Sequence, residues 1–110
     1  MKKDNAFKYE VSSGEIITIK VTATGLAALV AASRSGAQIL PEPKTAGTTP
    51  TFVFPVNSSS IIKMEFSFPG APATAKYDAV ITGSGGGDTG GFTILQTASI
   101  KDPNIRFMVV

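Results

Sequence analysis

The chain has 110 residues, enough for one domain with a buried core and too few for two. Its composition is 43% hydrophobic but has no His, Cys or Trp, so the commonest general base, the thiolate nucleophile and the usual zinc, haem and iron–sulfur ligands are missing. The net charge is only +2, and apart from the adjacent Lys2 and Lys3 the cations are scattered singly along the chain. The sequence therefore predicts a folded, non-enzymatic protein with no catalytic residue, metal or other cofactor, and with no nucleic-acid partner.

Alternating apolar and polar residues predict the first two strands, over residues 7–11 and 17–22, joined by a turn at Ser12–Gly14. The first five residues, which carry two adjacent lysines, are expected to fray. No apolar run in the chain approaches the ~20 residues that a membrane-spanning helix needs, so we expect no membrane span.

Residues 26–32 are rich in Ala and Leu and leave two interpretations open. The segment has helical propensity, and one helical turn would fit it. However, it is short, lacks an N-terminal capping residue and leads into a Ser35–Gly36 turn. We favour a hairpin of small-residue strands over the helical turn.

Residues 41–50 contain three prolines and are expected to form a loop that joins two sheets. Further strands are predicted at residues 51–54, 61–68, 77–82, 92–98 and 105–110, with a glycine-rich loop at 83–91. This gives about eight or nine short strands, at the spacing typical of an antiparallel β-sandwich. The expected fold is thus all-β: a single domain over residues 1–110, immunoglobulin-like or jelly-roll-like.

Short motifs that suggest catalysis or cofactor binding fail in their structural context. Residues 85–90 match G-x-G-x-x-G, but a strand follows where a dinucleotide site needs a helix. Asp88–Gly90 spells the aspartic-protease triplet, but glycines precede it instead of an apolar strand. Ser60–Lys63 matches S-x-x-K, but on a strand the two side chains point to opposite faces.

Loops on a rigid sandwich commonly carry binding sites, so the expected contact surfaces are the loop at 41–50 and the glycine-rich loop at 83–91. The polar side chains of the glycine-rich loop are the candidate ligand-binding residues: Ser84, Asp88 and Thr89. They offer too few oxygens for a built calcium site.

The strand pattern resembles bacterial pre-peptidase C-terminal-type β-sandwich modules over residues 6–97. The residues that carry the resemblance are Phe7, Tyr9, Val11, Gly14, Ile16, Thr18, Ile19 and Val21, then Ser35–Gly36, Phe52, Phe54, Ile62, Met64, Phe66, Phe68, Tyr77, Ala79, Ile81 and Gly83. Such modules often have an Asp-rich strand where this chain has Leu26–Val30, so a role tied to those acids does not carry over. The resemblance implies a non-catalytic accessory domain of an exported enzyme.

We therefore expect a non-catalytic binding or accessory module, extracytoplasmic or at the surface of a bacterial cell, whose partner is a protein or polysaccharide surface. The alternative is a structural subunit that self-associates by strand addition. Its apolar C-terminal strand would supply the contact, through Ile105, Phe107 and Val109.

Overall fold

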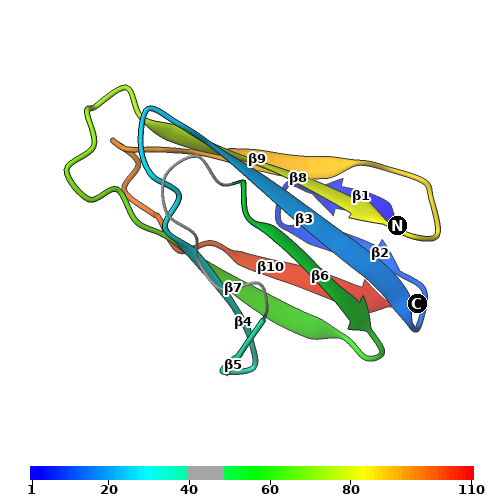
Figure 1. Cartoon of the computed structure of the whole chain (residues 1–110). Coiled ribbons are helices and arrows are strands. Elements are labelled where there is room, and N and C mark those ends of the chain that lie inside the picture. Colours follow the sequence, from blue (N-terminus) through cyan, green and yellow to red (C-terminus); the bar gives the residue numbers. More distant parts are fainter. Residues whose placement is uncertain (40–48) are drawn as a thin grey trace.

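The computed structural model describes residues 1–39 and 49–110, which form ten strands (Figure 1). Their bounds are β1 Lys2–Asn5, β2 Lys8–Val11, β3 Glu15–Thr24, β4 Val30–Arg34, β5 Ala37–Gln38, β6 Thr51–Val56, β7 Ser60–Phe66, β8 Lys76–Gly83, β9 Gly90–Leu95 and β10 Asn104–Val109. None of the described residues is helical, so that part of the chain has no helix able to cross a membrane. Most of the predicted loop at 41–50 lies outside the described residues.

The strands form two sheets. One has six strands in the order β1-β2-β10-β7-β4-β5, and the other has four in the order β6-β3-β8-β9. All neighbours are antiparallel except β2 and β10, which run parallel. The prediction of an all-β, mostly antiparallel fold is confirmed, with ten described strands in place of eight or nine.

Strand alternation creates the core between the sheets. In β3, Ile17, Ile19 and Val21 are fully buried while the residues between them point outward. The six-stranded sheet contributes Ile62 and Phe107 to the same hydrophobic cluster. Burying a side chain of this size contributes about 1.5–3 kcal/mol, so a core shared by both sheets holds the layers together.

The segment at residues 26–32 leads into a β-hairpin. Residues 30–34 form β4, which pairs with β5, and Ser35 and Gly36 between them both have positive φ, 50° and 88°. Two consecutive residues of positive φ define the type I′ turn whose twist suits a hairpin. The favoured hairpin is confirmed from residue 30 onward, residues 26–29 are neither strand nor helix, and the helical turn is wrong.

The expectation that residues 1–5 fray is wrong. Residues 2–5 form β1, which pairs with β2, and the Met1 ammonium is buried against the Glu15 carboxylate at 2.9 Å. The sequence did not predict this ion pair, because Glu15 lies fourteen residues from Met1 along the chain, across a turn.

The C-terminal strand does not offer a free edge, which corrects the basis of the strand-addition alternative. β10 lies between β2 and β7, so both of its edges are already paired. Ile105 and Phe107 are fully buried, and Val109 lies opposite Val11 of β2. The parallel pairing of β10 with β2 covers one edge of the C-terminal strand. The sequence did not predict this, because apolar patterning alone does not show which strands become neighbours.

Candidate functional site

Two of the three residues predicted to bind a ligand make hydrogen bonds within the fold, Ser84 to β3 and Asp88 to the N-terminal segment. The Ser84 hydroxyl accepts the N–H of Ile16 at 2.9 Å. The Asp88 carboxylate accepts the N–H of Lys3 at 2.9 Å, and the Asp88 N–H donates to the Met1 carbonyl at 2.8 Å. Thr89 is exposed. These contacts give Ser84 and Asp88 a structural role, and ligand binding by the loop stays a prediction.

A buried ion pair lies beneath this loop. The Met1 ammonium donates to Glu15 Oε2 at 2.9 Å and to the Gly86 carbonyl at 2.8 Å. Glu15 also accepts the N–H groups of Ser12, at 3.0 Å, and Gly85, at 3.2 Å. Burial acts to raise the pKa of Glu15, but these hydrogen bonds and the ammonium charge outweigh it and lower the pKa below its ordinary value. The carboxylate is thus held charged by its partners.

Glycines let the loop pack closely around the buried ion pair. A Cβ on Gly83 would collide with Glu15 Oε2, and a Cβ on Gly87 would collide with the Met1 carbonyl oxygen. Close packing around the ion pair therefore explains why glycine stands at these two positions. Sequence reasoning missed Glu15 because a single carboxylate on a strand most often faces solvent.

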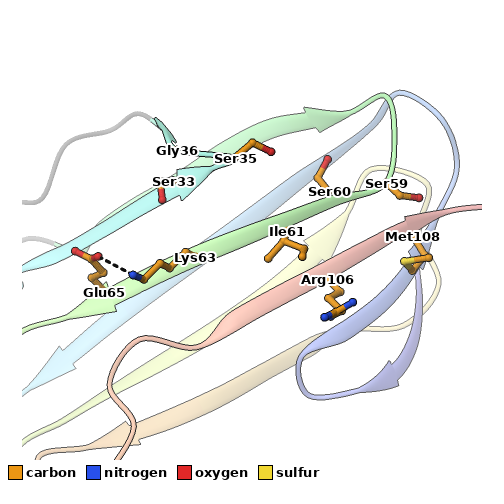
Figure 2. A pocket seen from close by; sticks show the side chains of 10 residues that line it. All are labelled: Ser33, Ser35, Gly36, Ser59, Ser60, Ile61, Lys63, Glu65, Arg106 and Met108. Atoms are coloured by element: carbon orange, nitrogen blue, oxygen red, sulfur yellow. Dashed lines mark ion pairs between the residues drawn. The ribbon is translucent and has the colours of Figure 1, made fainter.

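A different part of the surface is hollowed. A depression of about 720 Å³ lies on the outer face of the six-stranded sheet, beside the β4–β5 turn (Figure 2). Four serines and Gly36 line it together with outward-facing residues of β7 and β10. Those residues are Ile61, Lys63, Glu65, Arg106 and Met108. We call these five residues the outer-face cluster.

Strand alternation and register assemble the outer-face cluster. Ile62 and Met64 point into the core, so Ile61 and its alternate neighbours point outward from β7. β10 alternates in the same way, and its register places Arg106 directly opposite Ile61. Directly opposite residues of an antiparallel pair have Cβ atoms about 4.5–5.5 Å apart, so the two side chains are neighbours.

Further hollows extend across the same face. One of about 410 Å³ is lined by Asn5, Phe7, Lys8 and Asn104, and it shares Arg106 and Met108 with the first. Two smaller ones, of about 220 and 200 Å³, lie along β4 and β7 and share Glu65. Arg106 and Met108 thus stand between two depressions and can contact a ligand in either.

Arg106 differs from its cationic neighbours in having no counter-charge. Lys63 pairs with Glu65 at 3.4 Å, and Lys8 pairs with Asp4 at 3.5 Å. In the part of the chain that the structure describes, the Arg106 guanidinium has neither an ion-pair nor a hydrogen-bond partner. Its five N–H donors are therefore left to solvent or to a ligand.

No protein-family model, curated protein or solved structure matches this chain. The resemblance to pre-peptidase modules stays a prediction from the strand pattern, and the function is inferred from the geometry of the surface.

The S-x-x-K pair lies at this site but is not joined into a dyad. Ser60 takes the inward phase of β7, opposite Phe107, whereas Lys63 faces outward. The Ser60 hydroxyl donates to the Ser58 carbonyl at 2.7 Å, and Lys63 pairs with Glu65. Neither contact brings the lysine to the serine hydroxyl as a base.

Proposed function

We propose that this chain is a non-catalytic binding or accessory module that receives its ligand on the outer face of the six-stranded sheet. The observation that carries the proposal is the hollowed surface in which an unpaired Arg106 lies beside exposed Ile61 and Met108 (Figure 2). Concave surfaces that combine apolar contact area with a few polar groups are the usual places where ligands bind.

The wider assignment belongs to the same proposal: an immunoglobulin-like or jelly-roll-like sandwich from an exported or cell-surface bacterial protein. It is supported by the two mostly antiparallel sheets and by the strand pattern of the sequence. The alternative, a subunit that assembles by strand addition, would need a strand edge other than β10, since β10 has neighbours on both sides.

The test uses matched variants on the two outer faces. Ile61 is 44% exposed in the outer-face cluster, and Val80 is 47% exposed on the four-stranded sheet. The wild-type protein, Ile61→Lys and Val80→Lys are immobilised and probed with a glycan array and a display library of random linear peptides. Thermal unfolding first shows that both variants are folded.

We expect ligands enriched on the wild-type protein to lose binding to Ile61→Lys and to keep binding to Val80→Lys, because only the first change places a charge in the hollowed face. The proposal is wrong if neither library yields a ligand, or if the enriched ligands bind Ile61→Lys undiminished.

A further inference from the structure

The position of Arg106 in the sheet, and its lack of an ion pair, suit a direct contact with an anion. Lys8 lies opposite it on β2 and Ile61 opposite it on β7, so it stands in the middle of the sheet. Glu10 lies opposite Met108 on β2 and does not form an ion pair with Arg106. An anion at this part of the face would therefore meet one unpaired guanidinium.

Two of the groups next to Arg106 are aliphatic. Ile61 is its direct cross-strand neighbour, and Met108, 39% exposed, follows two residues along the same face of β10. A ligand whose carboxylate pairs with Arg106 would place its adjoining groups on these two side chains (Figure 2). Methionine adapts its shape to varied apolar partners, which suits a surface for side chains of a peptide.

The same surface lacks the features that hold a sugar ring. Among the residues that line the two larger depressions, Phe7 is the one aromatic, and its ring packs on Phe92 with centroids 5.1 Å apart. Sugar binding commonly relies on the open face of an aromatic ring. Aliphatic contact area beside a free guanidinium matches a peptide better than a polysaccharide.

Resting on the proposed function, we infer that the ligand of the outer face is an acidic peptide segment. An Asp or Glu side chain of that segment accepts two hydrogen bonds from the Arg106 guanidinium, and a neighbouring apolar side chain packs on Ile61 and Met108. Arginine binds carboxylates in this two-bonded geometry, which lysine does not provide.

The experiment takes linear peptides enriched on the wild-type protein and measures their dissociation constants for Arg106→Gln and for Lys20→Gln. Lys20 is an exposed lysine of β3 without an ion pair among the described residues, so it controls for the loss of one positive charge. We expect enriched peptides to carry Asp or Glu beside an apolar residue. Arg106→Gln should weaken binding about tenfold or more, and Lys20→Gln should leave it unchanged.

A double-mutant cycle gives the decisive readout. Replacing the peptide's Asp by Asn, or its Glu by Gln, should weaken binding to the wild-type protein as much as Arg106→Gln does, and should cause no further loss in that variant. Affinity should also fall as salt concentration rises.

Three outcomes overturn the inference. Enriched peptides that lack acids, and that respond to Ile61→Lys but not to Arg106→Gln, refute the acidic ligand and leave the proposed function standing. Peptides insensitive to both variants refute both. If no peptide is enriched and polygalacturonate binds through Arg106, the carboxylate belongs to a polysaccharide and the peptide ligand is wrong.

Discussion

Glu15 is the one acidic residue that is buried in the described part of the chain, and its partner is the N-terminal ammonium. We predict that Glu15→Gln lowers the free energy of unfolding by about 3 kcal/mol, because the amide leaves a buried ammonium without its counter-charge. Urea denaturation at neutral pH measures the loss. Glu65→Gln is the control, since the exposed Lys63–Glu65 pair contributes less than about 1 kcal/mol. Equal losses in the two variants would contradict the prediction.

The same carboxylate should make stability depend on pH. The folded pKa of Glu15 is lowered below its ordinary value of 4.5, so the folded state favours the charged form more than the unfolded state does. The stabilisation is therefore fully present above the ordinary pKa and is lost as the pH falls through the lowered one. Urea denaturation of the wild-type protein and Glu15→Gln across this range should show a constant difference above pH 4.5 that narrows in acid. A difference that does not change with pH would refute this.

At the scale of elements, the glycine-rich loop between β8 and β9 encloses the ion pair and gives a prediction of its own. Gly86 and Gly87 both have positive φ, 76° and 86°, so alanine is strained at either position by about 1 kcal/mol. A Cβ on Gly86 would meet open space, whereas one on Gly87 would collide with the Met1 carbonyl. We expect Gly87→Ala to lower Tm clearly more than Gly86→Ala in thermal unfolding. Equal shifts in Tm would mean that Met1 moves away from the added Cβ at no cost in stability.

Individual elements were predictable from the sequence where the signal is local. Alternation in β7 indicated that Ile62 and Met64 are buried, and it put Lys63 and Glu65 on the other face. The Ser35–Gly36 turn indicated the hairpin, because its backbone geometry is set by those two residues.

The neighbours of each element were not predictable. The outer-face cluster depends on β10 lying next to β7, a pairing that brings together residues more than forty positions apart. Apolar residues in the outward phase of their strands, Ile61 and Met108, were the local signs of this exposed apolar surface. Nothing local pointed to the pairing of β1 with β2 or to the buried end of the chain, since both depend on tertiary contacts.

For the whole molecule, β10 joins the strands near the N-terminus to the middle of the six-stranded sheet. Removing residues 107–110 would take away three of the four β10 residues that pair with β2, and with them the fully buried Phe107 of the core. We predict that this truncation prevents cooperative folding, because losing one large aromatic side chain alone costs about 3–5 kcal/mol against a typical total stability of about 5–15 kcal/mol.

Circular dichroism and light scattering test the truncation together, with removal of Val110 alone as the control. That residue is 80% exposed, and its backbone N–H donates one hydrogen bond to the Val11 carbonyl, so its loss should leave folding intact. A truncated chain that stays folded and changes only its oligomeric state would favour assembly through the C-terminal strand. Loss of the folded signal, with a wild-type protein that light scattering shows to be monomeric, would show that β10 acts within one copy of the chain.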